Sequence, residues 1–176
     1  MKLLDICDIE TWQALEDEIY ERSGLNPAVF NPEGIRIIQK PRWPNRLCPE
    51  IKATPKGQSF ICATAHMNLA NMARQSRQAV IEECDAGMLK IVVPIFVNDT
   101  FVGAAGGCGL ILGDGEVETF LINKITEIDA DRVETLAGEV TAIPMEKARD
   151  LADLIQKRIE QIVAAHLARQ ADTANP

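Results

Sequence analysis

The hydrophobic pattern of the N-terminal third predicts one helix followed by a β-hairpin. Apolar residues recur at helical spacing from Thr11 to Arg22, with polar residues between them. Residues 25–30 are typical of a short strand, and residues 35–38 of a second one. Between them stands Asn-Pro-Glu-Gly at 31–34, a turn sequence in which proline presets one dihedral angle and glycine accepts a positive φ. We therefore expect a hairpin over residues 25–38.

The middle of the chain predicts two helical segments and then three strands. A short helical turn is expected at 48–53, and a longer helix over 56–77. Residues 79–84 are then predicted to be a strand, and residues 88–97 form a nearly continuous apolar run, as buried central strands do. A turn leads into the last strand at 100–112, which completes a second hairpin.

The remainder of the chain is predicted to be helical. Residues 116–128 and 130–140 are two helices, with Asp129 as the N-cap of the second. Residues 144–171 carry one long amphipathic pattern, and Pro144 stands at the first-turn position that tolerates proline. Its apolar stripe fits either the sheet of the same chain or a second copy, and a short contact in a homodimer is the preferred interpretation. The stripe consists of Leu151, Leu154, Ile155, Ile159, Ile162, Val163 and Leu167.

This order of elements predicts an α+β fold. We expect a central antiparallel sheet of about five strands flanked by helices, with a long C-terminal helix, in the layout of PAS and GAF domains. The expected organisation is a sensory domain over 1–115, C-terminal helices for dimerisation or signal output over 116–170, and a disordered tail over 171–176.

Charge and hydropathy exclude several classes of protein. The formal net charge of the 176 residues is -8, and the basic residues are scattered, so direct nucleic-acid binding is not expected. Acidic residues interrupt the N-terminus before the apolar core of a signal peptide is complete. No apolar run approaches the roughly 18 residues of a membrane helix. The sequence predicts a cytoplasmic protein without a membrane segment.

The cysteines are the main candidates for chemistry. Their odd number in a chain without an export signal favours free thiols or metal ligands over disulfides. Cys48, Cys62, Cys84 and Cys108 fall on four different predicted elements, and Cys7 lies apart from them. Four thiolates around one point are the usual cage for zinc or an iron–sulfur cluster. The alternative is that each cysteine is a small buried apolar side chain.

A series of short motifs resembles a known family. The chain reads LCPEI at 47–51, GQSFIC at 57–62, CDAGML at 84–89, VPI at 93–95 and VGAAGG at 102–107. In this order the motifs resemble the PocR sensory domain family, a PAS-like ligand-binding module of prokaryotic signalling proteins. The resemblance covers about residues 11–112.

The resemblance implies a binding module for small, simple hydrocarbon derivatives such as short diols. The matching positions are Cys48, Cys62 and Cys84, with Gly87 and Pro94 as scaffold. The chain departs from the family after the paired glycines, where many members carry glutamine and this chain carries a fourth thiol, Cys108. That departure brings a metal or a cluster into contention.

Four further residues are candidates for ligand contact. His66 lies one helical turn after Cys62, so both side chains share a face; a partly buried, hydrogen-bonded histidine is the favoured alternative. Trp43 fits a lid over a pocket or packing at the core edge. Gly106 and Gly107 do not open a helix as a dinucleotide loop would, and glycines inside a strand indicate close approach of a ligand or another backbone.

These observations predict a sensory protein that holds a small ligand or a metal centre in a cysteine-lined pocket and signals through its C-terminal helices to a partner protein. The alternative is a redox- or gas-sensing metalloprotein that binds an iron–sulfur cluster or haem with the same four cysteines. A small thiol enzyme is less favoured, since the sequence has no serine–histidine–acid pattern and no HExxH motif.

Overall fold

The fold is α+β and is built on one antiparallel sheet, as the sequence predicts. The computed structural model describes residues 1–173. Its central sheet has four strands in the order β1-β4-β3-β2, and all neighbouring pairs are antiparallel. The strands are β1 (Asn26–Phe30), β2 (Val80–Glu83), β3 (Leu89–Val97) and β4 (Thr100–Cys108).

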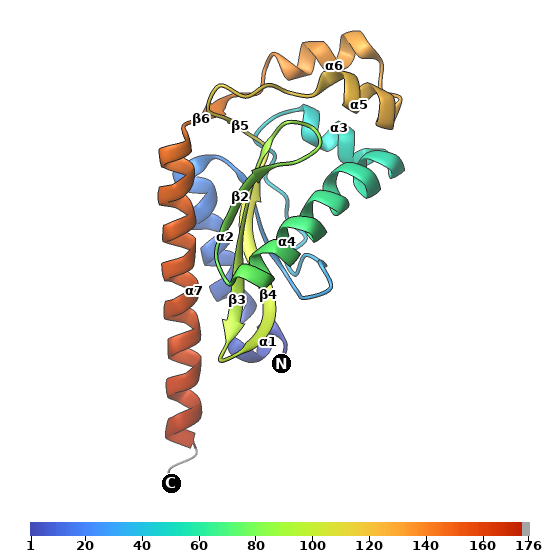
Figure 1. Cartoon of the computed structure of the whole chain (residues 1–176). Coiled ribbons are helices and arrows are strands. Elements are labelled where there is room, and N and C mark those ends of the chain that lie inside the picture. Colours follow the sequence, from blue (N-terminus) through green and yellow to red (C-terminus); the bar gives the residue numbers. More distant parts are fainter. Residues whose placement is uncertain (174–176) are drawn as a thin grey trace.

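Helices cover both faces and one end of this sheet (Figure 1). Helices α2 and α7 pack on one face, and α4 packs on the other, whereas α3, α5 and α6 gather beyond one end. The helical elements are α1 (Leu3–Ile6), α2 (Ile9–Ser23), α3 (Leu47–Ala53), the π-helix η1 (Gly57–Ala63), α4 (Thr64–Ser76), α5 (Thr119–Thr126), α6 (Ala130–Ala137) and α7 (Met145–Thr173). In the part of the chain described here, no helix has the length and apolarity needed to cross a bilayer.

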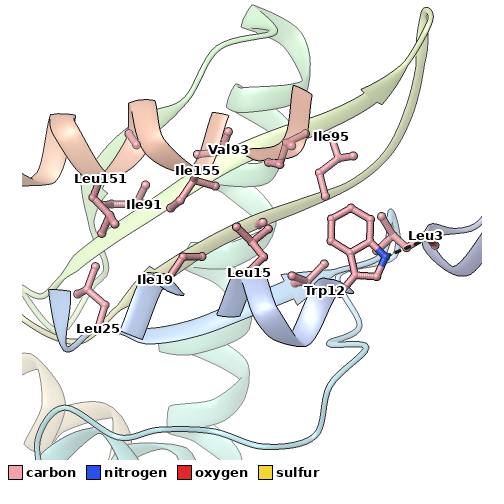
Figure 2. Close-up of a cluster of buried hydrophobic side chains, with 14 of the residues drawn as sticks. Leu3, Trp12, Leu15, Ile19, Leu25, Ile91, Val93, Ile95, Leu151 and Ile155 are labelled. Carbon is pink, nitrogen blue, oxygen red and sulfur yellow. Dashed lines mark hydrogen bonds between the residues drawn. The ribbon is translucent and has the colours of Figure 1, made fainter. Parts of the chain in front are cut away.

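The largest core lies between the sheet and the pair α2 and α7. Alternate residues of β3 point into it, because successive side chains of a strand face opposite sides. Figure 2 shows Ile91, Val93 and Ile95 of β3 meeting apolar side chains of both helices. Trp12 of α2 is fully buried in this core, and its indole N–H donates a hydrogen bond to the Leu3 carbonyl at 3.1 Å (Figure 2). This bond ties the short helix α1, which the sequence did not predict, to the main core.

Local caps set helix ends in the structure, and the predicted N-cap Asp129 is confirmed. The Asp8 side chain accepts a hydrogen bond from the Thr11 N–H at 2.9 Å and begins α2, and Gly24 ends it with a φ of 71°. Asp129 caps α6 in the same way through the Arg132 N–H at 3.0 Å. The helix expected over 56–77 is present as one continuous helical run, but its first part is the π-helix η1 and only the second part is the α-helix α4.

Two predictions about the strands are wrong. The strand expected over 100–112 ends at Cys108, because Gly109 has a φ of 105° and turns the chain out of the ladder. Beyond it, β5 (Ile111–Leu112) pairs in parallel with β6 (Ala142–Ile143) as a separate two-stranded sheet. The second arm of the first hairpin is reduced to one bridge between Phe30 and Arg36. The central sheet therefore has four strands and not about five.

Helix α7 uses its apolar stripe within the chain. Leu151, Ile155 and Ile159 are buried in the large core against β3 and α2. The preferred placement of this stripe at a dimer contact is therefore replaced by intramolecular packing, and a homodimer stays a prediction. The helix continues to Thr173, into the segment expected to be a tail, and residues 174–176 lie outside the described residues.

Truncation of a buried α7 side chain tests this packing. We expect Ile155→Ala to lower the free energy of unfolding by ~2–5 kcal/mol, because it leaves a cavity between α7 and the sheet. The matched change Lys157→Ala, on the exposed face of the same helix, should change it by less than ~0.5 kcal/mol. Urea denaturation followed by circular dichroism measures both values, and equal losses would contradict the packing of α7 on β3.

Candidate functional site

A cavity of about 430 Å³ lies on the sheet face opposite α2 and α7. Its floor is formed by β1, β4 and β3, whose register places their side chains in rows across the sheet. The rows are Asn26, Cys108 and Lys90, then Ala28, Gly106 and Val92, then Phe30 and Ala104. The middle of the floor consists of small residues, so the sheet leaves room above it.

The cover of the cavity comes from α3, the π-helix η1 and the start of α4. Ile51 and Lys52 of α3, Gln58 and Ile61 of η1, and His66 of α4 line it. A π-helix has wider turns than an α-helix and is frequent at functional sites. Here it follows a tight contact with α3, because a Cβ atom on Gly57 would collide with the Ile51 carbonyl. Within η1, Ile61 is buried and Cys62 is partly buried at the cavity, whereas Phe60 is exposed.

The structure brings the four predicted cysteines to the lining of this one cavity. Cys48 lies on α3, Cys62 on η1, Cys84 after β2 and Cys108 at the end of β4, and each is partly buried. Cys84 is held by a turn in which its N–H donates to the Met88 carbonyl and its carbonyl accepts from the Gly87 N–H, both at 2.8 Å. Cys7 lies outside the cavity, in a groove between α2 and α7.

Burial keeps three of the cavity thiols protonated at neutral pH. It raises the pKa of Cys62 to about 11, and the nearby Cys108 and Cys84 add to the rise. The pKa values of Cys48 and Cys84 are also raised, first by burial and then, for Cys48, by the neighbouring Cys108. These three thiols are therefore neutral, weakly polar groups, whereas nucleophilic thiols require a lowered pKa.

Cys48 has sulfur and amide neighbours. Its sulfur lies 3.6 Å from the Met88 thioether and 3.3 Å from the Asn45 side-chain nitrogen. The same Asn45 amide donates to the Gly109 carbonyl at 2.6 Å, so α3 is tied to the end of β4.

Among residues 1–173, no three or more His, Cys, Asp or Glu side chains come close enough together to hold one metal ion. The four-thiol metal centre therefore stays a prediction.

His66, Phe30 and Lys90 form a second group in the cavity. The imidazole of His66 stacks on the Phe30 ring with 3.8 Å between centroids, and the Lys90 ammonium lies 5.7 Å from the centroid of the same ring. Burial, and then the positive charge of Lys90, lowers the pKa of His66 to about 3. His66 is therefore a neutral imidazole at physiological pH. No acceptor or donor of the described residues pairs with its buried Nδ1 atom.

Trp43 and the glycines also border the cavity, but the structure gives the glycines a packing role. Trp43 lines the cavity, and the Lys52 ammonium lies 5.8 Å from its ring centroid. A Cβ atom on Gly106 would collide with the Ile91 carbonyl of β3, and one on Gly107 would lie 2.9 Å from the Leu25 Cβ. These two positions require glycine because neighbouring protein atoms approach closely, as the strand-interior interpretation allows.

The sequence reasoning missed Lys90 and Phe30 as cavity residues, and Asn45 as the residue that joins Cys48 to the end of β4. Lys90 had a usable signal, because it is the one charged residue inside the apolar run at 88–97. For Phe30 the only signal in the sequence was the alternation of side chains along a strand. Asn45 stands in a loop whose path is set by tertiary contacts, which the sequence does not show.

A comparison with protein-family models gives one match. The model described as the sensory domain found in PocR matches residues 5–167. The chain belongs to the PocR sensory domain family. The match extends well past residue 112, where the resemblance seen in the sequence ends, and includes α5, α6 and most of α7. No curated protein and no solved structure matches the chain.

A substitution at Gly106 tests the close packing of the floor of this PocR domain. We expect Gly106→Ala to lower the free energy of unfolding by ~1–3 kcal/mol, because the new methyl group collides with the β3 backbone. Gly138→Ala is the matched control, since Gly138 has a helical φ of -63° and a Cβ there meets nothing closer than 3.6 Å. Urea denaturation should show an unchanged or slightly raised stability for the control. An equal change in the free energy of unfolding for the two variants would contradict the close approach of β3 to β4.

Alkylation of the thiols tests their protonation. Because the pKa of Cys62 in the folded PocR domain is about 11, its iodoacetamide reaction should accelerate with pH up to about 11. In urea the same thiol should reach half of its maximal rate near its ordinary pKa of about 8.5. At pH 8 the folded protein should react roughly 200-fold more slowly than the unfolded one. Peptide mass spectrometry gives the rate for each cysteine, and an inflection below pH 9 in the folded protein would refute the burial of this thiol.

Proposed function

We propose that this PocR domain senses a small molecule held in the cavity between the sheet and the helices α3, η1 and α4. Membership in the family supports a ligand-binding sensory role. The observation that carries the finer proposal is the cavity itself, which has about 430 Å³ of space and an apolar lining with a few polar groups. Sites for small molecules usually have these properties.

The four cysteines serve in this proposal as neutral lining. The raised pKa values of Cys48, Cys62 and Cys84 argue against a nucleophilic role, and a thiol is a small, polarizable group that suits an adaptable apolar wall. The part of the ligand near Cys48 and Met88 is accordingly a carbon chain and not a charged or strongly hydrogen-bonding group.

The cover of the cavity provides a route to the C-terminal helices. Leu47 and Ile51 of α3 and Ile61 of η1 belong to the same apolar cluster as Ile122 of α5 and Val133 of α6. A ligand that moves α3 or η1 must therefore repack α5 and α6. The response is limited by the difference in the affinity of the ligand for the two arrangements. The proposal includes a partner protein that binds α5, α6 or α7 and distinguishes their two arrangements.

A panel of probes with cavity variants tests this function. Isothermal titration would use 1,2-propanediol, 1-butanol and butyrate as probes. We expect at least one probe to bind, and Cys108→Phe, which fills the cavity, to weaken its binding at least tenfold. Thr100→Phe adds the same side chain at the exposed start of the same strand and should leave binding unchanged. On binding, hydrogen exchange should slow in α5 and α6 as well as in the cover.

Two outcomes would contradict the proposal. One is binding that Cys108→Phe leaves intact, and the other is the absence of binding by the whole panel. Metal analysis and an absorption spectrum of anaerobically purified protein, measured on the same samples, address the sequence-based alternative. A stoichiometric amount of iron or zinc that is lost on changing the four cysteines to serine would favour the metal centre over the small-molecule sensor.

A further inference from the structure

Lys90 is a cation that reaches across the floor of the cavity. In the sheet it stands in the row of Cys108, yet its ammonium lies 5.7 Å from the ring centroid of Phe30, which stands two rows further along the strands. The row between them consists of Ala28, Gly106 and Val92. The long side chain therefore extends over small residues and brings its charge inside the cavity.

This charge lacks a carboxylate partner. None of the ion pairs formed by the described residues includes Lys90. Glu82 stands opposite Lys90 on the edge strand β2, but its side chain is exposed and makes no ion pair with it. Arg36, another cation of the lining, is compensated by the buried Glu16 at 3.3 Å. The lining also contains Glu33 and Lys52, and Lys90 itself is partly exposed and makes no ion pair with Glu33. An anion that enters the cavity can therefore pair with the Lys90 ammonium at short range.

His66 supplies a second group for the same purpose. It is only 5% exposed and stacked on Phe30, so the imidazole and the Lys90 ammonium approach the same ring. Its buried Nδ1 has no partner among the described residues, and its neutral ring can donate one hydrogen bond and accept another. A buried polar group without a partner is unusual in folded proteins and marks a place where a ligand can complete the hydrogen bonding.

We propose that Lys90 and His66 together bind one anionic oxygen group, so that the ligand of this domain is a small carboxylate whose carbon chain lies toward Cys48 and Met88. The inference rests on the proposed function and names the chemical class of the ligand. Lysine binds an anion as a point charge, and a hydrogen bond to a charged group is worth more than a neutral one. The neutral Cys48 thiol and the Met88 thioether at the other side suit an aliphatic chain.

The test compares two probes of equal chain length that differ in charge. Butyrate and 1-butanol are titrated into the protein at pH 7 and low ionic strength by isothermal calorimetry. We expect butyrate to bind about tenfold more tightly than 1-butanol, a difference that corresponds to ~1.4 kcal/mol. Lys90→Met, which retains an apolar stem, should remove this preference, whereas Lys124→Met, an exposed lysine on α5, should retain it. His66→Phe keeps the stacked ring and should weaken butyrate binding about fivefold with little effect on 1-butanol.

The outcomes separate this inference from the proposed function. If 1-butanol or 1,2-propanediol binds in a Cys108-sensitive manner and butyrate binds no better, the anion inference is overturned and the sensor proposal stands. If no probe binds, both are overturned. Lys90→Gln is a second variant in case Lys90→Met is poorly folded, and circular dichroism establishes the folding of each. Persistence of the butyrate preference in both folded Lys90 variants would also overturn the inference.

Discussion

Everything at the site depends on the way β3 and β4 divide their side chains between two differently packed faces. One face carries the branched residues Ile91, Val93 and Ile95 into a core with α2 and α7. On the other face α4 packs on Val92 and Ala104, whereas the region around Gly106 and Cys108 is left open to the cavity. Because a shift of one residue would exchange the two faces, the β3–β4 register that buries the core also opens the cavity.

The rim of the cavity is held by a buried charge pair. Glu16 of α2 is 1% exposed, accepts a hydrogen bond from the Val29 N–H at 2.9 Å and pairs with Arg36 at 3.3 Å. Burial raises the pKa of Glu16, and the charge of Arg36 opposes this rise. Removal of either partner would leave the other as an uncompensated buried charge. The free-energy cost of that charge exceeds the net stabilisation that the pair provides. The segment that ends in Arg36 reaches α4 at Gly34, where a Cβ would lie 2.7 Å from the Met67 sulfur.

The sequence predicts the parts of this fold whose causes are local. Helices α2 and α6 have an aspartate cap and an apolar stripe, and both features can be seen in the sequence. The π-helix η1 could not be predicted, because it depends on the approach of α3 to Gly57 across a turn. The pairing of β5 with β6 joins residues about 30 positions apart, and local propensity says nothing about it.

The candidate site shows the same division between local and tertiary causes. The family motifs select Cys48, Cys62 and Cys84, and Cys108 follows from its position after the paired glycines, but each thiol is carried by a different element, so only packing brings all four to the lining of one cavity. The sequence alone could not place Lys90 in the cavity for a related reason. Successive side chains of a strand face opposite sides of the sheet, and only the packing of the rest of the chain decides which side borders the cavity.

The two faces of the sheet also differ in how easily they can respond to a ligand. On the α7 face, a 29-residue helix packs against long apolar side chains, so movement there would disrupt the main core. On the cavity face, the cover consists of the short helix α3 and the π-helix η1, which share an apolar cluster with α5 and α6. Because β6 and Pro144 connect α6 to α7, repacking of this smaller cluster would act on the N-terminal end of α7. In the response that we propose, movement therefore begins in the cover and reaches α7 at its first turn, while the core along the rest of the helix is preserved.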